Sequence, residues 1–437
     1  MKSFYIITFG CQMNEHDSER MSGMLQKVGY QPAATPDDAE MIILNTCSIR
    51  EKAEQKFYSE LGRLTNQKEE NSKAKMIAVA GCIAQQEGRQ ILSRVPNVDL
   101  IIGPSDITRL PELVRLQKER HNPVIETSGD ETYHHKLVPV SRTDSLKAWV
   151  SIMYGCNNFC SYCVVPYLRG RERSRPAENI LAEIQELAAQ GYKEVTLLGQ
   201  NVNSYGNGTL PSCSFPELLR RINDITGIER IRFVTSHPKD LSDDLISAMR
   251  DLPKVCESLH LPLQSGSDRI LSAMNRKYSI SEYQEKINKL RNAIPDISLT
   301  TDIIVGFPGE GEADFQATLT MLKQTAYDGI FAFKYSRRPN TAALKLKDHL
   351  SDHIKDIRLS KVFDLQKPIT LERNHRHIGA VLEVFVDGKS KRGGKLAGRT
   401  RGNKVVNFEG AESMIGRTVN VCIKTASQNS LAGILCE

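Results

Sequence analysis

The feature that most constrains this chain is a run of three cysteines, Cys156, Cys160 and Cys163, spaced as Cys-x3-Cys-x2-Cys. The run follows the apolar segment AWVSIMY (residues 148–154), so we expect the three thiols in a loop at the carboxyl end of a strand. Thiolates are the ligands that iron–sulfur clusters prefer, and three of them leave one iron of a four-iron cluster open. Structural zinc sites usually take four ligands, so zinc and inert packing are the less favoured interpretations.

The chain holds ten cysteines among its 437 residues, a number that in a secreted protein would suggest disulfides. Its N-terminus, MKSFYIITFGCQMNEHDSE, turns polar too early for a signal peptide. The longest apolar stretch, around Met76–Ala84, is too short to span a bilayer. We therefore expect a cytoplasmic protein without a membrane segment, in which cysteines serve as metal ligands, redox groups or buried apolar side chains.

Residues 1–125 alternate short apolar runs with stretches that can form helices. The segments SFYIITF, AEMIILN and AKMIAVA are typical of buried strands, and each precedes a polar, helix-capable stretch. This alternation predicts an α/β domain with a mainly parallel sheet.

Each of those three strands is followed by a cysteine, namely Cys11, Cys47 and Cys82. Their separations of 36 and 35 residues correspond to about one β/α unit each. Because equivalent positions in successive parallel strands lie side by side at one edge of the sheet, the three thiols are expected to converge there. A second three-ligand cluster is the economical inference, and buried small apolar side chains are the alternative.

Residues 147–370 repeat the alternation with longer helices. The strands expected there are AWVSIMY, EVTLLG, RIRFVTS, SLHLPLQ, LTTDIIVG and GIFAFKYS, with helical periodicity between them. Six β/α units predict an incomplete (β/α)6 barrel with its site at the carboxyl ends of the strands. A doubly wound sheet is the alternative.

Two further segments complete the predicted organisation. Residues 126–146 are polar, contain Pro139 and lack a sustained period, which predicts a linker. Residues 371–437 show short β patterns separated by glycine-rich turns, which predicts a small all-β, OB-like barrel. That last segment holds eleven Lys and Arg against six Asp and Glu, whereas the whole chain carries a net charge of only +6. Such concentrated positive charge suits a polyanion such as RNA, and a solvated basic face is the alternative.

The motifs together resemble the radical S-adenosylmethionine (SAM) methylthiotransferase family, and most closely its tRNA-modifying branch. TFGCQMNEHDSE, LNTCSIREKAEQK and AGCIAQ are similar to the N-terminal auxiliary-cluster domain of that family. GCNNFCSYCVVPYLRGRERSR, LLGQNVNSY, TSHP, LPLQSGSDRIL, MNRKY and DIIVGFPGE resemble its radical SAM domain. GRTRGNKVVNF resembles the family's TRAM module, an RNA-binding barrel, so the likeness covers essentially the whole chain.

The resemblance implies methylthiolation of carbon 2 of N6-isopentenyladenosine, also called N6-dimethylallyladenosine, at position 37 of tRNA, beside the anticodon. It also implies two 4Fe-4S clusters and two SAM molecules. One cluster, on Cys156, Cys160 and Cys163, cleaves SAM to a 5′-deoxyadenosyl radical, while the auxiliary cluster, on Cys11, Cys47 and Cys82, carries the sulfur. Two alternatives are methylthiolation of threonylcarbamoyl-adenosine or of a ribosomal-protein side chain. A third, from another class, is a non-catalytic iron–sulfur RNA-binding or sensor protein.

Four residues are candidate SAM contacts. Tyr162 stands between the last two cysteines, where the resemblance implies an aromatic ring against adenine, although plain loop packing is the alternative. Gln200, Ser236 and Gln264 each follow a predicted barrel strand, where barrel enzymes place substrate and cofactor contacts. Any of these three could instead cap a helix.

Eight residues are candidate RNA contacts, because arginine and lysine suit phosphate and aromatic rings stack on bases. Four alternate in LRGRERSR and four lie in GRTRGNKVVNF: Arg169, Arg171, Arg173, Arg175, Arg399, Arg401, Lys404 and Phe408. The alternatives are a solvated loop for the first group and a buried phenylalanine under a basic strand for the second.

The resemblance also implies partners: the tRNA anticodon stem-loop, a low-potential electron donor such as flavodoxin or ferredoxin, and a sulfur or cluster donor protein. We expect a monomer that makes no membrane contact. The sequence departs from the family where a usual Tyr-Ser-x-Arg-Pro-Gly-Thr run reads YSRRPNTAA, with Asn340 in place of glycine. This substitution raises a question only about local loop geometry.

Overall fold

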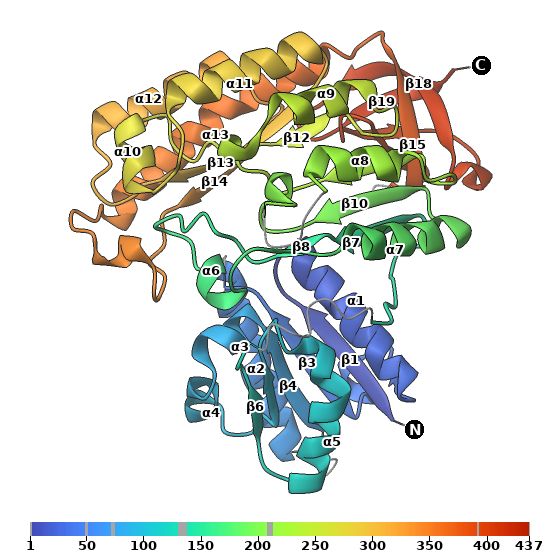
Figure 1. Ribbon diagram of the computed structural model, residues 1–437, viewed down its shortest axis with the longest axis vertical. Coiled ribbons are helices and arrows are strands. Elements are labelled where there is room, and N and C mark those ends of the chain that lie inside the picture. The colour runs from blue at the N-terminus through green and yellow to red at the C-terminus, as the bar shows by residue number, and fades with distance from the viewer. Residues whose placement is uncertain are drawn as a thin grey trace.

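The computed structural model describes residues 2–48, 51–70, 75–129, 138–207, 213–390 and 393–436. Figure 1 shows an N-terminal α/β unit at one end of the long axis, with the central unit and a C-terminal barrel at the other. The short helix α6 (Val165–Leu168) and helix α1 (Gln12–Lys27) lie where the N-terminal and central units meet.

The N-terminal unit is built on a six-stranded parallel sheet, as predicted. Its spatial order is β2 (Gln31–Pro32), β1 (Ser3–Thr8), β3 (Met41–Thr46), β4 (Met76–Gly81), β5 (Leu100–Ile102) and β6 (Val124–Glu126). Helices α1 and α5 (Leu110–Arg120) cover one face, and α2 (Glu51–Glu70), α3 (Cys82–Glu87) and α4 (Gln90–Arg94) cover the other. β3 and β4 are buried along their whole length and mostly apolar, because both faces of the sheet are covered there.

Strand β3 shows this two-sided burial most directly. Met41 and Ile43 pack with the helices α1 and α5, whereas Ile42 and Leu44 pack with α2, α3 and α4. Because strand side chains alternate between faces, a continuous apolar run contributes side chains to the cores on both faces of the sheet. β1, β3 and β4 are neighbours in register, so their carboxyl ends lie side by side.

The central unit contains six parallel strands in two sets of three. The first set is β7 (Lys147–Ser151), β10 (Glu194–Leu198) and β11 (Arg230–Phe233); the second is β12 (Ser258–His260), β13 (Ser298–Val305) and β14 (Gly329–Lys334). An isolated bridge from Ile231 to Val255 continues the array from β11 toward β12.

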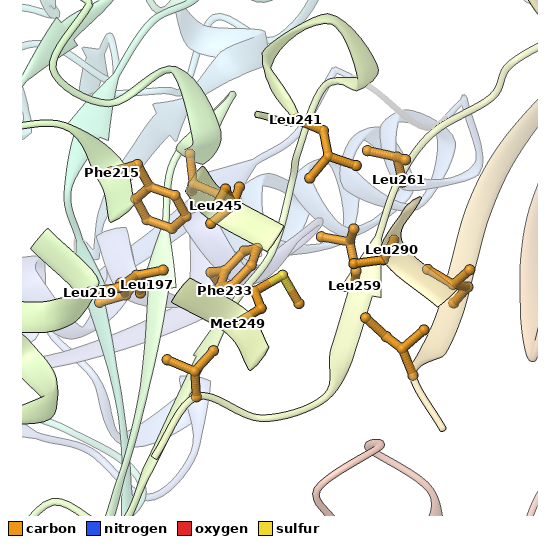
Figure 2. Close-up of a cluster of buried hydrophobic side chains, with 14 of the residues drawn as sticks. Leu197, Phe215, Leu219, Phe233, Leu241, Leu245, Met249, Leu259, Leu261 and Leu290 are labelled. Carbon is orange, nitrogen blue, oxygen red and sulfur yellow. The ribbon is translucent and has the colours of Figure 1, made fainter. Parts of the chain in front are cut away.

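The helices of this unit pack on a single face of the strand array. They are α7 (Ala177–Ala189), α8 (Phe215–Asn223), α9 (Asp243–Asp251), α11 (Ile280–Ala293), α12 (Glu312–Thr325) and α13 (Asp352–His375). Their apolar side chains form one core with outward-facing strand residues such as Leu197, Phe233 and Leu259, part of which Figure 2 shows. Helices on one face only are typical of an incomplete barrel and exclude the doubly wound alternative.

The opposite face of the array carries polar and aromatic side chains. Alternate residues of each strand line a cavity there: Lys147 and Trp149, Glu194 and Thr196, Arg232, Ser258 and His260, Thr300 and Asp302, and Phe331 and Phe333. The two-residue period therefore separates an apolar outer face from a functional inner face. The predicted strand 148–154 is divided, because β7 ends at Ser151 and β8 (Met153–Tyr154) pairs with β9 (Arg173–Ser174).

The C-terminal unit is a closed barrel, as predicted. Its strands are β15 (Val381–Lys389), β16 (Leu396–Thr400), β17 (Val405–Phe408), β19 (Leu431–Leu435) and β18 (Thr418–Ala426) in spatial order. Sequence patterns predicted four of these and missed β19. The core contains Val384, Val406, Phe408 and Ile423. Helix α13 precedes it and runs to His375, so the predicted boundary at residue 371 falls inside that helix.

The predicted linker, residues 126–146, overlaps β6 at Glu126, and its residues 130–137 lie outside the described part of the chain. Its later residues are fixed to α1, since the backbone N–H of Ser141 donates to the carbonyl of Glu19 at 3.0 Å. The backbone N–H of Thr143 also donates to the Glu19 carboxylate at 3.1 Å. In the described ranges no helix is long and apolar enough to cross a membrane.

Candidate functional site

Cys11, Cys47 and Cys82 follow β1, β3 and β4, the three neighbouring strands of the N-terminal sheet. Cys47 and Cys82 are buried, and all three line the same cavity. Gly10 has a φ of +133°, and a Cβ on it would lie 2.4 Å from the Cβ of Cys47. The glycine before Cys11 therefore lets the first two cysteine loops approach each other. The predicted convergence of the three strand ends is present.

Two asparagines that we did not single out from the sequence connect these loops. Asn14, three residues after Cys11, accepts from the Cys11 thiol at 3.3 Å and donates to the carbonyl of Thr46 at 2.9 Å. Asn45 donates to the carbonyl of Asn14 at 2.8 Å. Both asparagines are fully buried. Their signal in the sequence was their position beside Cys11 and Cys47 in TFGCQMN and LNTC.

Charge in this first triad is unevenly distributed. A hydrogen bond with Cys47 lowers the pKa of the Cys11 thiol to about 6, assisted by the positive charge of Arg169. Burial raises the pKa of Cys82, and Arg169 opposes that rise. The lowered pKa favours the thiolate form of Cys11, which is the form that binds metals.

The second triad, Cys156, Cys160 and Cys163, lies in the loop that leaves β8. Gly155, directly before it, has a φ of +73°, and its missing Cβ would lie 2.0 Å from the carbonyl oxygen of Arg171. The backbone N–H of Asn158 points at the sulfur of Cys156 at 3.5 Å. Burial raises the pKa of Cys156 to about 11 and that of Cys163 to about 12. Buried thiols of this kind lose their protons when iron binds the sulfur.

Arg276 is a further residue of this site that the sequence did not reveal. Its side chain is buried, and Nη1 lies 3.5 Å from the sulfur of Cys160. Nη2 donates to the carbonyl of Pro262 at 2.9 Å, and Nε donates to the Tyr278 hydroxyl at 3.0 Å. The guanidinium thus places positive charge beside the cysteine sulfurs. No spacing rule connects Arg276 to a cysteine 116 residues earlier.

The arrangement suits clusters better than single ions. Throughout the described residues, no group of three or more His, Cys, Asp or Glu side chains is placed to hold one metal ion. A four-iron cluster takes each thiolate on a different iron, so its ligands stand farther apart than those around zinc. The two triads, rich in sulfur and supplied with N–H donors, fit that donor set.

Three of the four predicted SAM contacts carry an unsatisfied polar atom. Gln200, Ser236 and Gln264 follow the strands β10, β11 and β12. Within the described structure, Gln200 Nε2, Ser236 Oγ and Gln264 Oε1 are buried without a hydrogen-bond partner. Unpartnered buried polar atoms are rare in folded proteins, so three at successive strand ends indicate a polar ligand there.

Backbone geometry at Gln264, a hydrogen bond of Gln200 and the packing of Tyr162 further describe the predicted SAM site. Gln264 has a φ of +69°, a strained value of the kind that concentrates at functional sites. Gln200 Oε1 accepts from the backbone N–H of Gly155 at 2.5 Å, which connects the strand end to the cysteine loop. Tyr162 packs with Ile304 against the cluster that contains Phe307 and Tyr335.

One open cavity of about 1190 Å³ is lined by the first cysteine triad and by residues of the central and C-terminal units. Cys11, Cys47 and Cys82 line it beside Val164 and Gln200 at the carboxyl ends of the central strands. Arg399 and Lys404 of the C-terminal barrel also line it. A single space therefore runs from the first cysteine triad along the inner face of the incomplete barrel to the C-terminal unit.

Several predicted RNA contacts need correction. Arg169 and Arg175 are 6% and 7% exposed, and they pair with Asp17 and Glu183 at 2.9 Å each. Phe408 is fully buried in the barrel core, so its predicted stacking on a base is wrong. Buried and paired side chains of this kind cannot reach an RNA backbone in this conformation.

Arg401 and Lys404 hold the barrel on the central unit instead of presenting a free basic surface. Arg401 makes two 2.7 Å hydrogen bonds to Glu257, and Lys404 Nζ lies 2.9 Å from Asp328. Arg171 is exposed and lies over the ring of Phe159 at 4.6 Å. Arg173 is half-buried, and the side chain of Arg399 is 40% exposed. Because Nε and Nη1 of Arg173 are buried, the accessible candidates are Arg171 and Arg399.

Comparison with protein families divides the chain into three matched regions. Residues 3–103 match a family described as uncharacterized protein family UPF0004. Residues 150–322 match the radical SAM superfamily, and residues 375–436 match the TRAM domain. Each region coincides with one of the three structural units.

Solved structures share the fold at low sequence identity. A radical S-adenosylmethionine methyltransferase, TsrM, from Kitasatospora setae aligns with a TM-score of 0.59 at 13% identity, covering 79% of this chain and 74% of that one. The cobalamin-dependent radical enzyme OxsB aligns with a TM-score of 0.52 at 13% identity, covering 84% of this chain and 56% of that one. These likenesses support the arrangement of the α/β units.

Curated relatives are similar along their whole length. A tRNA-2-methylthio-N(6)-dimethylallyladenosine synthase from Thermodesulfovibrio yellowstonii is 51% identical, over 99% of this chain and 98% of the relative. Synthases of the same name from Clostridium botulinum and Carboxydothermus hydrogenoformans are 50% and 48% identical, over 99% of this chain and 96% and 99% of theirs. The structure combines two cysteine triads, an incomplete barrel and a TRAM barrel, and these relatives match it from end to end. The chain therefore belongs to the tRNA-2-methylthio-N(6)-dimethylallyladenosine synthase family.

Proposed function

We propose that this chain is a radical SAM transferase that adds a methylthio group to carbon 2 of N6-dimethylallyladenosine at position 37 of tRNA. The observation that carries this is the cavity that the first cysteine triad lines beside the residue that follows the second triad. Cys11, Cys47 and Cys82 face it at the same end as Val164 and Gln200, which adjoin the second cysteine loop. A substrate base in that cavity would lie between the two cysteine sites.

Two 4Fe-4S clusters and SAM fit the residues present. Cys11, Cys47 and Cys82 would hold one cluster, and Cys156, Cys160 and Cys163 the other, each with an open iron. When bound, these groups and two SAM molecules supply a 5′-deoxyadenosyl radical, a methyl group and the sulfur. Gln200, Ser236 and Gln264 would receive the polar groups of SAM, because each has a buried polar atom without a partner in the described structure.

The protein's own task is to orient the reacting groups and exclude water. Arg276 and the backbone N–H of Asn158 direct positive charge toward the sulfurs of Cys160 and Cys156. Asn14 holds the Cys11 loop against β3 through the carbonyl of Thr46. Burial of Cys47, Cys82 and Cys160 keeps bulk water from these positions.

One wall of the cavity suits the apolar five-carbon substituent of the substrate. Phe331, Phe333 and Phe363 line the cavity and are 52%, 39% and 39% exposed. Large exposed aromatic side chains inside a cavity indicate a binding surface, because leaving them in water is unfavourable. We assign this wall to the dimethylallyl group.

RNA and protein partners follow from the same proposal. Arg171 and Arg399 would contact phosphates of the anticodon stem-loop. A low-potential electron donor such as flavodoxin or ferredoxin, and a sulfur or cluster donor protein, would complete the reaction. We place the enzyme in the cytoplasm, as a monomer, with an auxiliary-cluster domain at 1–125, a linker at 126–146, a radical SAM domain at 147–370 and a TRAM domain at 371–437.

Nucleosides of tRNA from a deletion strain test the substrate. We expect 2-methylthio-N6-dimethylallyladenosine to disappear and its unmodified precursor to accumulate, and a plasmid carrying this chain to reverse both changes. Unchanged levels of the methylthio nucleoside would refute the proposal. Loss of the threonylcarbamoyl analogue or of a ribosomal-protein modification instead would identify one of the alternative substrates.

A further inference from the structure

Arg169 belongs to the central unit in sequence but places its side chain against the N-terminal unit. It directly follows α6, the single helical turn after Cys163. Its Nη2 donates to Asp17 Oδ2 at 2.9 Å, and these two side chains are 7% and 1% exposed. Asp17 lies in α1, the helix that begins directly after Cys11. The ion pair therefore connects the loop of the second triad to the helix of the first.

The surroundings of Arg169 bring its charge to the first triad. Arg169 and the cysteines Cys11, Cys47 and Cys82 line the same end of the cavity. Cys82 packs with Val164 and Leu168 in one apolar cluster, and Leu168 directly precedes Arg169. The charge of Arg169 therefore lies beside the first triad.

The attachment of the central unit to the N-terminal unit does not by itself require a charged residue at position 169. A buried ion pair stabilises a fold weakly, because both ions lose their hydration, and apolar side chains of similar size serve as well. Asp17 is also shared with Arg20, whose Nη1 lies 3.8 Å from its other oxygen. Two arginines thus face one carboxylate, so Asp17 cannot neutralise both positive charges.

We propose that Arg169 is a positioning residue that raises the reduction potential of the auxiliary cluster and fixes the two cysteine triads relative to each other. This rests on the proposed function, because it takes Cys11, Cys47 and Cys82 as ligands of that cluster. An added electron makes the cluster more negative, so a buried positive charge beside its sulfurs favours the reduced form. Because the second cysteine loop supplies this charge, the auxiliary site acquires its potential only when the two units are docked.

The test uses the full chain with Cys156, Cys160 and Cys163 replaced by alanine, so that only the first triad binds iron. Midpoint potentials are measured by redox titration followed by EPR, together with iron per chain. The variants are Arg169→Met, Arg169→Lys and Asp17→Asn. Arg115→Met, on an exposed face of α5 in the same unit, is the matched control for loss of one positive charge.

The two partners should act in opposite directions. Arg169→Met should lower the potential by at least 59 mV, a tenfold change in a one-electron equilibrium. Asp17→Asn should raise it, because a negative charge is removed while Arg169 stays. Arg169→Lys should fall between Arg169→Met and the parent, and Arg115→Met should match the parent.

A purely structural ion pair predicts that Arg169→Met and Asp17→Asn shift the potential in the same direction or leave it unchanged, and either result overturns the proposal. If Arg169→Met fails to fold or to bind iron, Asp17→Asn decides, since a raised potential supports the proposal and an unmoved one refutes it. A parent without iron would refute the cluster assignment itself. Iron at about four per chain with unmoved potentials would refute only the role of Arg169.

Discussion

Single glycines control how closely the cysteine loops approach other backbone. A Cβ at position 155 would lie 2.0 Å from the carbonyl oxygen of Arg171, in a backbone with φ of +73°. Gly155→Ala should therefore displace the loop of Cys156, at a cost of about 1–3 kcal/mol, and lose roughly half of the bound iron. Iron analysis after anaerobic reconstitution measures this. Gly191→Ala shares the positive φ without a neighbour within 4 Å, and it should keep the full iron content.

The backbone at position 340 explains why asparagine can replace the glycine that is usual in the family. It adopts a φ of +63°, the left-handed region that glycine occupies most easily and asparagine tolerates best among other residues. Asn340→Gly should leave the free energy of unfolding nearly unchanged, whereas Asn340→Val should lower it by about 1–2 kcal/mol. Denaturant unfolding of the metal-free chain measures both, and equal stabilities would contradict the backbone argument.

The sequence predicted the cysteines far better than the residues that surround them. Cysteines carry their signal locally, in spacing and in position after a strand. The partner of Arg169 is 152 residues away, and that of Arg401 is 144 residues away. Local composition cannot show whether an arginine contacts RNA or pairs with a carboxylate of another unit. The arginines of LRGRERSR and GRTRGNKVVNF were therefore predicted to contact RNA. Arg276 was missed for the same reason, because the cysteine that it contacts is 116 residues away in the sequence.

In the N-terminal unit the three long strands β1, β3 and β4 were predicted and the shorter strands β2, β5 and β6 were missed. β1, β3 and β4 are six residues each, and every residue of β3 and β4 is buried, whereas β5 and β6 have only three residues. β19 contains Gly433, where a Cβ would lie 2.3 Å from the carbonyl oxygen of Cys422. Barrel closure requires the small residue there, and that residue weakens the β pattern in the sequence.

Strand β14 carries the apolar wall, with Phe331 and Phe333 on the inner face and Ala332 in the core. Replacing both phenylalanines by alanine should weaken binding of a dimethylallylated anticodon stem-loop about tenfold or more. Binding of the same RNA without the dimethylallyl group should change little. Equal losses for both RNAs, measured by titration at one salt concentration, would contradict the assignment of this wall.

At the scale of the molecule, ion pairs connect the C-terminal barrel to the central unit. Arg401 binds Glu257, Arg230 Nη2 lies 2.7 Å from Glu383, and Lys147 Nζ lies 2.9 Å from Asp387. The attraction within such ion pairs falls as the distance between the charges grows and as the salt concentration increases. The barrel's position over one end of the cavity therefore depends on several ion pairs, and one of them uses Arg401, which was a predicted RNA contact.

Arg401→Ala should loosen that docking at a cost of about 2 kcal/mol, because two charge-assisted hydrogen bonds to Glu257 are lost. We expect a larger radius of gyration in small-angle scattering and faster proteolysis before the barrel. Lys389→Ala removes an exposed pair with Glu412 within the barrel and serves as the control. An unchanged radius and cleavage rate in Arg401→Ala would show that the apolar contacts suffice.

The division of labour between the two cysteine triads is tested most directly by products of one reaction. Reconstituted protein, SAM, dithionite and dimethylallylated tRNA are incubated, and 5′-deoxyadenosine and the methylthio nucleoside are quantified by mass spectrometry. Alanine at Cys156, Cys160 and Cys163 should abolish both products. Alanine at Cys11, Cys47 and Cys82 should abolish the methylthio nucleoside but leave 5′-deoxyadenosine formation. Methylthio product from the second variant, or 5′-deoxyadenosine from the first, would contradict the assignment of these triads.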